Sequence, residues 1–419
     1  MKALLFSIGT RGDIEPFLAI ARVLQEKEWE VICVFPEPYR ELVEEMGFAF
    51  RGFSSEIMEL MEGQNAQLLF GGQGSFFKRM GRLLGMARRS LKLSKESLVL
   101  QHRIQVEEAP GLILYHPKCN YSVLWGMTHA GQTILVNPTL DPLTDLGGNP
   151  RTFLHRIRVG AVYTMKAAML KMTSRKFKSE YRGTRLRISS IKKTMLEKEK
   201  TLYTLSPSLF TKPLHAPRRT FITGFYDRSS PGSWQPGEEL LQFIERHDKI
   251  IVITFGSMAN PHPGEKTRSI LNVLKRHAIP AIIDVAGGGL EAVEEPPGHV
   301  FYTGHLPHGW LFPRVHAVVH HGGAGTTHMA LKYGCPCLII PHVLDQFHWE
   351  KTVARLKLGP AGISIRKLNE RTIDSRLQEL YSRSDYKKNA EKISMAMLKE
   401  SDPEKLYDVI TERTGTSHR

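Results

Sequence analysis

The chain has 419 residues, of which 41% are hydrophobic and 24% are charged, a globular composition rather than a disordered or fibrous one. This length predicts two or three domains. No apolar run reaches the roughly 18 residues of a transmembrane helix, and the first eight residues read as a strand rather than a signal peptide. The four cysteines form neither a disulfide framework nor paired zinc spacing, so we expect a reducing cytoplasm.

The formal net charge of +15 is concentrated in two segments. Residues 76–103 contain 8 Lys and Arg against 1 Glu, and residues 151–200 contain 15 against 3. Both space their apolar residues as amphipathic helices do, so we expect helical insertions there. Such helices could lie peripherally on an anionic membrane surface, or they could pack on their own domain with a solvated charged face. Nucleic-acid binding through residues 151–200 is disfavoured, because no aromatic interleaving and no known motif is evident there.

Apolar segments alternate with helical patterns along the first half of the chain. Residues 3–8 read as a strand, and Phe17, Ile20, Ala21 and Leu24 follow at helical spacing. Short connections between strand, helix and strand are typical of a parallel sheet. Further strands are expected at residues 29–35, 111–115, 130–137 and 203–206.

The same alternation repeats after a stretch rich in Pro, Gly and Ser. Residues 227–237 read as a linker between two domains. We therefore predict an α/β protein with one domain over residues 1–226 and a second over residues 238–400. Strands of the second domain are expected at residues 249–255, 281–285, 300–303, 317–320 and 337–340.

A glycine-rich turn, HHGGAGTT at residues 320–327, follows one of these strands and precedes a helix. Glycines let the backbone approach an anion, and a helix start offers free N–H groups and a partial positive charge. The turn therefore predicts a diphosphate cradle, with a plain tight turn as the alternative. It is neither a P-loop nor the GxGxxG fingerprint, which disfavours a dinucleotide-dependent oxidoreductase.

Other polar residues stand at the carboxyl ends of predicted strands, where open α/β sheets bind ligands. Asp345 and Gln346 follow one strand, and a carboxylate beside an amide suits sugar hydroxyls. The alternative is that Asp345 caps the next helix. Gly256 and Ser257 follow another strand, and residues 305–308 follow a third. His320, His321 and His328 lack a closing Cys or carboxylate at suitable spacing, so no metal site is predicted.

Together these segments resemble the UDP-dependent glycosyltransferases, a family that includes sterol glucosyltransferases, plant natural-product transferases and bacterial antibiotic transferases. The sterol and antibiotic branch is the most similar. The resemblance covers about half of the chain and leaves the middle unmatched. Its motifs are PHGWLF at residues 307–312, the glycine-rich turn, Pro341 with Asp345 and Gln346, FGSM at residues 255–258 and GTRGDIEPF at residues 9–17.

The resemblance implies a GT-B fold, in which two Rossmann-like domains face each other across a cleft. The domain over residues 1–226 would bind the acceptor, and the domain over residues 238–400 would bind the nucleotide sugar. Residues 401–419 would form a C-terminal helix that crosses back to the first domain. Such enzymes invert the anomeric centre and need neither metal nor cofactor, because the UDP-sugar is a co-substrate.

The resemblance also assigns donor-binding roles to the residues of this chain that occupy the matching motif positions. The resemblance implies that Asp345 and Gln346 hold the sugar. Plant members carry Trp and Gln where His305 and His308 stand here, which leaves the exact nucleotide open. The residues that would contact the diphosphate are Gly256, Ser257, His321, Gly323, Ala324, Gly325, Thr326 and Thr327, and those that would flank the base are His305, Leu306 and His308.

The reaction needs a base that takes a proton from the acceptor hydroxyl. Plant members use a His after the first strand, whereas this chain has Asp13 in that loop, as the antibiotic and sterol transferases do. The alternative is that Asp13 is a helix N-cap. His116, after another strand, could orient Asp13, replace it or bind the acceptor. Gly12 and Ile14 would contact the acceptor.

These residues predict an inverting, metal-independent transferase that moves a sugar, expected to be glucose, from UDP to a hydroxyl of a lipophilic acceptor. The acceptor could be a sterol, a terpenoid or another lipid. Two alternatives stay open. One is a non-catalytic nucleotide-sugar or membrane-binding protein on the same fold, and the other is a transferase that uses a TDP-sugar on a polyketide or peptide.

Overall fold

The computed structural model describes residues 1–53, 96–129, 133–141, 145, 152–177, 186–213, 216–228, 234–293, 295–343 and 345–412. These form two compact units. Unit 1 contains the described residues up to 227 and from 401 onward, and unit 2 contains residues 228–400. Most of the basic segment 76–103 and parts of 151–200, of the linker 227–237 and of the C-terminal segment 401–419 lie outside the described residues. No helix of the described ranges has the length and hydropathy of a membrane span.

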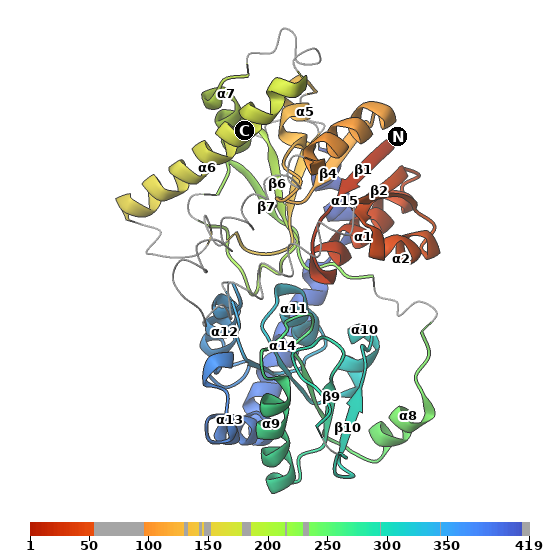
Figure 1. The fold of residues 1–419 in the computed structure, drawn as a ribbon, viewed down its shortest axis with the longest axis vertical. Coiled ribbons are helices and arrows are strands. Elements are labelled where there is room, and N and C mark those ends of the chain that lie inside the picture. Colours follow the sequence, from red (N-terminus) through yellow and green to blue (C-terminus); the bar gives the residue numbers. More distant parts are fainter. Residues whose placement is uncertain are drawn as a thin grey trace. The chain divides into compact units, whose positions relative to one another are not determined.

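Unit 1 is built on a parallel sheet with the strand order β3-β2-β1-β4-β5-β6-β7 (Figure 1). The order places β1 between β2 and β4, with Leu5 opposite both Cys33 and Leu114. Chain connections leave this centre in opposite directions, so the loops after β1 and β4 lie at the switch point of the sheet. The strands are β1 (Lys2–Phe6), β2 (Glu30–Pro36), β3 (Ala49–Phe53), β4 (Leu112–Tyr115), β5 (Thr133–Asn137), β6 (Lys200–Tyr203) and β7 (Arg219–Ile222).

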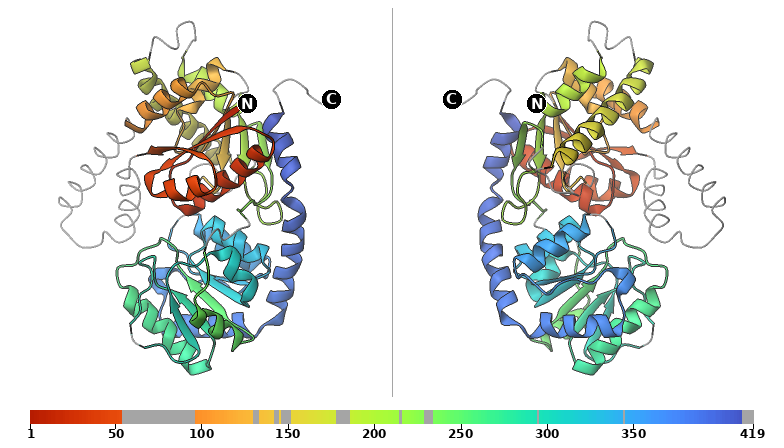
Figure 2. Two further views of the ribbon diagram at one scale, coloured as in Figure 1. Left: turned by 90° about the vertical axis from the view of Figure 1, so that its right-hand side faces the viewer. Right: turned by 90° about the vertical axis from the view of Figure 1, so that its left-hand side faces the viewer.

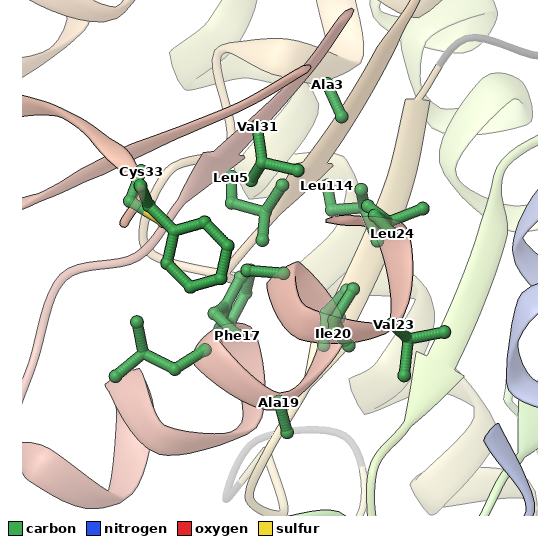
Figure 3. Close-up of a cluster of buried hydrophobic side chains, with 14 of the residues drawn as sticks. Ala3, Leu5, Phe17, Ala19, Ile20, Val23, Leu24, Val31, Cys33 and Leu114 are labelled. Carbon is green, nitrogen blue, oxygen red and sulfur yellow. The ribbon is translucent and has the colours of Figure 1, made fainter. Parts of the chain in front are cut away.

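Helices cover both faces of this sheet. The first helix, α1 (Arg11–Glu26), starts after the N-cap Thr10, and its apolar side chains pack against alternate residues of β1 and β2. Figure 3 shows Phe17, Ile20 and Leu24 directed at Leu5 and Val31 in this core. The other helical segments of unit 1 are α2 (Arg40–Glu45), residues 96–108, α5 (Ser122–Thr128), α6 (Phe153–Ser174), α7 (Ile188–Lys193) and α15 (Pro403–Thr411), with short turns η1 (Glu37–Tyr39), η2 (Arg175–Phe177) and η3 (Thr194–Lys198).

The C-terminal helix α15 packs on the same face as α1. Leu406 and Ile410 belong to the apolar core of that face. The buried Lys200 ammonium of β6 donates to the backbone oxygens of Val409, at 2.5 Å, and Glu412, at 2.8 Å. A cation at a helix C-terminus stabilises the unpaired carbonyls of the last turn. Residues 403–411 are thereby fixed to unit 1, although unit 2 precedes them in the sequence.

The opposite face of the unit 1 sheet is covered by α5, α6 and α7. Val159, Tyr163, Ala167 and Leu170 of α6 pack with Phe6 of β1 in a second apolar cluster. Their spacing of three and four residues places them on one side of the helix. One long face of α6 is therefore part of the core of unit 1.

Unit 2 repeats this architecture on a parallel sheet with the order β10-β9-β8-β11-β12. The central strand β8 (Ile251–Thr254) lies between β9 (Ala281–Asp284) and β11 (Ala317–His320), and the edges are β10 (Val300–Thr303) and β12 (Cys337–Ile339). The helices are α8 (Glu238–Glu245), α9 (Pro263–His277), α10 (His308–Leu311), α11 (Ala324–Lys332), α12 (Gln346–Arg355), α13 (Glu370–Ser382) and α14 (Ser384–Glu400), with turns η4 (Phe312–Arg314) and η5 (Ile365–Lys367).

The predicted α/β class with two parallel sheets is confirmed. All five strands expected in unit 2 form within a few residues of their predicted bounds. In unit 1, β3 and β7 were not predicted, and β6 ends at Tyr203, where the predicted strand begins. Both unpredicted strands lie at sheet edges, where one side of the strand is exposed and the apolar run is broken.

Candidate active site

Both units place their candidate residues in the same part of the fold, after the two central strands. In unit 1, Asp13 follows β1 and His116 follows β4. In unit 2, Ser257 follows β8 and His321 follows β11. These loops flank the point where the strand order of each sheet reverses, which is the usual ligand site of open parallel sheets. Residues more than 60 positions apart in sequence are thereby brought together within each unit.

Asp13 is almost completely buried and is surrounded by hydrogen-bond donors. Its Oδ1 lies 3.3 Å from His116 Nε2, and its Oδ2 lies 3.3 Å from Lys118 Nζ and 2.9 Å from the Thr10 backbone nitrogen. The Ser7 hydroxyl donates to the Asp13 carbonyl oxygen at 2.8 Å. Asp13 is therefore the third residue of the helix and accepts from the N-cap residue Thr10, so it is not itself the N-cap.

The environment of Asp13 keeps its carboxylate ionised. Burial by itself would raise the pKa of Asp13, but the Lys118 ammonium, the His116 hydrogen bond and the Thr10 N–H outweigh burial and lower this pKa below its usual range. Burial also lowers the pKa of His116, against the opposing effect of the Asp13 carboxylate. At neutral pH the pair is consequently an anionic carboxylate beside a neutral imidazole.

The hydrogen bonds of His116 fix its tautomer. The Lys118 backbone N–H donates to His116 Nδ1 at 3.2 Å, so Nδ1 is an acceptor. In a neutral imidazole the proton then lies on Nε2, which faces Asp13 Oδ1. Both ring nitrogens are thus engaged, which leaves His116 without a free lone pair for an acceptor hydroxyl. Of the roles considered for His116, this geometry favours orienting Asp13.

The sequence reasoning missed Lys118. It lies two residues beyond His116, and its backbone and side chain contact both members of the pair. Its ammonium is partly exposed, with 40% of the side chain accessible, whereas only 11% of the Asp13 side chain is accessible. The available signal was a basic residue two positions after His116, which itself follows a predicted strand.

Of the two expected acceptor contacts, Ile14 differs from the prediction. It is fully buried in the core beneath α1, where it packs with Phe17, because its position directs it toward the sheet. That orientation leaves Ile14 no surface for an acceptor, so its assignment is corrected to a core residue. Gly12 is half-buried at the start of α1.

The glycine-rich turn of unit 2 leads directly into α11. Gly323 is the N-cap of this helix, and no side chain caps its first turn. His321 Nδ1 is buried and has no hydrogen-bond partner in the described structure. Burial, reinforced by neighbouring histidines, lowers the pKa of His321 well below its usual value, so the ring is neutral. An uncapped helix start beside an unpaired imidazole nitrogen suits a phosphate group.

The loop after β8 contacts this turn. An ideal Cβ on Gly256 would lie 3.1 Å from His321 Cε1, and one on Gly323 would lie 2.5 Å from His321 Nε2. The His321 ring is therefore enclosed between two glycines, where larger residues would displace it. Ser257, the next residue, is exposed. Ala324, Gly325 and Thr326 form the first turn of α11 and present its backbone N–H groups.

Thr327 and Gln346 use their polar groups inside the protein. The Thr327 hydroxyl donates to the Gly323 carbonyl oxygen at 2.9 Å, so it stabilises the first turn of α11 instead of offering the expected donor to a ligand. Gln346 Oε1 accepts from the backbone nitrogens of His342, at 2.7 Å, and Val343, at 3.0 Å. This leaves the Gln346 amide group as its remaining donor. Asp345 is the N-cap residue of α12, as the alternative interpretation expected, although only its backbone carbonyl accepts hydrogen bonds from the helix and its side chain makes no capping hydrogen bond.

The segment after β10 lines a small cavity at the carboxyl ends of the unit 2 strands. Leu306 is buried, His305 is exposed, and the His308 ring stacks on Phe312 with a centroid separation of 4.5 Å. The stacked face of His308 is therefore occupied by a protein side chain. The cavity is lined by Val252, Thr254, Ile282, Asp284, Thr303, Leu306, His308 and Leu311.

Gly287 fixes the position of the Gly256 loop and provides a test of it. An ideal Cβ on Gly287 would lie 1.6 Å from the Gly256 backbone oxygen. Gly287→Ala should displace this loop and lower the free energy of unfolding by about 1–3 kcal/mol, the usual cost of overpacking. Gly304→Ala is the matched control, because no atom lies within 4 Å of its added carbon. Equal free energies of unfolding for the two variants, measured with denaturant, would show that Gly287 does not hold this loop in place.

Comparisons with known proteins give a consistent result. Residues 3–107 match the family described as glycosyltransferase family 28 N-terminal domain, and residues 268–412 match the erythromycin biosynthesis protein CIII-like, C-terminal domain. A sterol 3-beta-glucosyltransferase of Arabidopsis thaliana is 30% identical over 399 residues, an alignment that covers 90% of this chain and 62% of that protein. This chain therefore spans less than two thirds of the length of that relative.

Solved structures with a similar fold include glycosyltransferases of antibiotic biosynthesis. The glycosyltransferase of kitacinnamycin superimposes with a TM-score of 0.69 at 16% identity, and the alignment covers 98% of both chains. The spinosyn rhamnosyltransferase SpnG, solved in complex with thymidine diphosphate, superimposes with a TM-score of 0.68 at 16% identity over 98% of this chain and 100% of that one. The chain therefore has the GT-B fold, and its two halves are similar to a glycosyltransferase family 28 N-terminal domain and to an erythromycin biosynthesis protein CIII-like C-terminal domain.

Proposed function

We propose that the protein transfers glucose from UDP-glucose to the hydroxyl group of a sterol or a similar lipophilic alcohol, with inversion at the anomeric carbon. The similarity to a sterol 3-beta-glucosyltransferase supports the acceptor class. The observation that carries the reaction is the buried carboxylate of Asp13, which is held ionised beside a neutral His116 at the switch point of unit 1.

In this proposal Asp13 is the general base. The acceptor oxygen attacks the anomeric carbon, the bond from that carbon to the UDP oxygen breaks, and Asp13 takes the hydroxyl proton. Its lowered pKa makes Asp13 a weak base toward a resting alcohol. The hydroxyl becomes acidic as its oxygen bonds to the anomeric carbon, so proton transfer late in that step suits such a base. His116 and Lys118 would hold the carboxylate in position.

Unit 2 would bind the nucleotide sugar. The first turn of α11, His321 and Ser257 would stabilise the charge of the leaving diphosphate, so we propose no metal ion or cofactor. The carboxylate of Asp345 and the amide of Gln346 would hold the sugar hydroxyls. His305, Leu306 and His308 would flank the base, and of these Leu306 and His308 line the cavity after β10. Because SpnG was solved with thymidine diphosphate, a TDP-sugar is the competing donor.

The donor site has a specific test in His321. His321→Ala should weaken UDP binding about tenfold to a hundredfold, because a hydrogen bond to a charged group contributes about 1.5–3 kcal/mol. His247→Ala, two residues beyond the end of α8, is the control, since that imidazole hydrogen-bonds to the Phe243 carbonyl oxygen of α8 at 2.9 Å. Calorimetric titration with UDP measures both. An unchanged dissociation constant for His321→Ala would exclude His321 from the diphosphate site.

The function as a whole is tested by nucleotide release. The purified protein is mixed with UDP-glucose or TDP-glucose and with a panel of sterols, terpenoids and macrolides. The proposal expects UDP release that depends on a sterol or terpenoid. Release only from TDP-glucose with a macrolide would replace it with the antibiotic alternative. Tight UDP binding without release for any acceptor would favour a non-catalytic protein.

A further inference from the structure

We propose that the outer face of α6 docks on an anionic lipid bilayer. The helix has 22 residues, which corresponds to a length of about 33 Å. Its inner face is part of the core of unit 1 through Val159, Tyr163, Ala167 and Leu170. Figure 2 (right) shows α6, in yellow, at the surface of unit 1. The chemistry of its other face therefore determines what this surface can bind.

That outer face is apolar. Of the twelve large hydrophobic side chains exposed in the described structure, six lie on this one helix. Such a concentration is unusual, because exposed apolar residues are normally scattered singly over a protein surface. The six side chains, with their exposed fractions, are Phe153 (73%), Leu154 (77%), Ile157 (51%), Met165 (52%), Met169 (49%) and Met172 (67%).

The exposed side chains form a stripe along the helix. Leu154, Ile157, Met165 and Met172 recur at intervals close to multiples of 3.6 residues, and the exposed Ala161 continues the series. This stripe lies opposite the buried face of the same helix. We refer to the six exposed hydrophobic side chains as the α6 stripe. Unbranched methionines make up half of it, and they adapt readily to a fluid partner.

The charged residues of α6 indicate what kind of surface its outer face binds. No Asp or Glu occurs between Phe153 and Ser174, whereas Arg156, Arg158, Lys166 and Lys171 do. Lys166 is paired with Asp141 of unit 1 at 2.7 Å, and Arg158 contacts His155 Nδ1 at 3.2 Å, so every charged side chain of the helix itself is cationic. An apolar stripe on a helix whose charged residues are all cationic is complementary to lipid acyl chains beneath anionic headgroups. An interfacial helix of this kind lies in the plane of the membrane.

Docking on a membrane would assist the proposed reaction. This part of the inference therefore rests on the proposed function. A sterol or another lipophilic alcohol resides in a membrane. The unit that α6 belongs to also carries Asp13, so docking would bring the proposed base close to its acceptor. The surface itself follows from α6 alone and does not depend on any catalytic assignment.

The test is vesicle co-sedimentation of the whole protein without donor or acceptor. The wild type should bind vesicles that contain phosphatidylglycerol and phosphatidylcholine at least tenfold more tightly than vesicles of phosphatidylcholine alone, since each basic residue near an anionic surface adds about 1 kcal/mol. The triple variant Leu154→Ser, Met165→Ser, Met172→Ser should lose at least tenfold of this affinity. Its positions are exposed, so thermal unfolding should remain as in the wild type.

A matched control comes from α14. The variant Met395→Ser, Leu398→Ser removes two side chains that are 58% and 60% exposed in unit 2, and it should bind vesicles as the wild type does. Wild-type affinity of the triple variant would overturn the proposal. So would a dimer in analytical ultracentrifugation that the triple variant converts to a monomer, because a second copy would then cover the stripe.

The same variant separates this inference from the proposed function. With a detergent-dispersed sterol, the triple variant should retain wild-type transfer, while its transfer to sterol in anionic vesicles should fall. Vesicle binding by a protein that transfers no sugar would leave the α6 stripe established and refute only the proposed activity.

Discussion

Asp13→Asn should lower kcat for glucosyl transfer about 10²–10⁴-fold, which is the usual contribution of a positioned general base. The substituted side chain has nearly the same shape, and its oxygen can still accept from the Thr10 N–H that now contacts Asp13 at 2.9 Å. It cannot take a proton from the acceptor hydroxyl. The affinity for UDP should remain within about twofold, because the proposed donor residues belong to unit 2.

Glu15→Gln is the matched control for this variant. Glu15 lies on the same helix and pairs with Arg11 at 2.8 Å, so the substitution also neutralises an acid of α1. Its kcat should stay within about twofold of the wild type, since surface ion pairs contribute little. Steady-state kinetics with thermal unfolding of both variants would measure the effect. Wild-type kcat in folded Asp13→Asn would remove Asp13 from the mechanism.

Unit 2 should lose stability steeply as the pH falls from about 6.5 toward 4. Burial lowers the pKa of His320 to about 3 and that of His342 to about 4, and burial likewise lowers the pKa of His328 to about 4. In the unfolded chain these groups protonate near pH 6.5. Between the two values the unfolded state binds more protons, so the free energy of unfolding decreases as the pH falls.

Each of these histidines should contribute up to about 1.4 kcal/mol per pH unit to this slope. His320→Asn isolates one of them, because an amide oxygen can replace Nδ1 as the acceptor of the Gly322 N–H, now at 3.0 Å. Denaturant unfolding between pH 4.5 and 6.5 should give a shallower slope for this variant. His262→Asn, at an exposed position, should keep the wild-type slope. Equal slopes for wild type and His320→Asn would contradict the buried neutral state of His320.

The sheet of unit 2 could be predicted almost completely because its strands are short runs of buried apolar residues, such as Ile251–Thr254 and Ala317–His320. Edge strands lack this signal. Ala49–Phe53 contains Arg51 and Gly52, and its burial alternates, so nothing in its composition separates it from a loop. Such a strand forms because β2 offers it a partner, which is a tertiary effect that local sequence does not encode.

Some features of the candidate site could likewise be predicted from the sequence, and others could not. Asp13 and the glycine-rich turn could be identified because their motifs resemble those of a known family. The contact between Asp13 and His116 depends on strand order, since β1 and β4 are far apart in the sequence and are neighbours only in the sheet. The engagement of the Thr327 hydroxyl within α11 depends on side-chain geometry. Sequence motifs predict where the loops of the site lie. Side-chain packing determines which polar atoms of those loops remain available to a ligand.

The central claim is most directly tested by analysing the product of one reaction. The wild-type protein is incubated with UDP-glucose labelled with ¹³C in the sugar and with a dispersed sterol, and the extracted lipid is examined by mass spectrometry and NMR. We expect a sterol carrying one labelled glucose in the β configuration, formed by the wild type and at least about a hundredfold more slowly by Asp13→Asn. An unlabelled sterol despite measured UDP binding, or a product with the α configuration, would contradict this expectation.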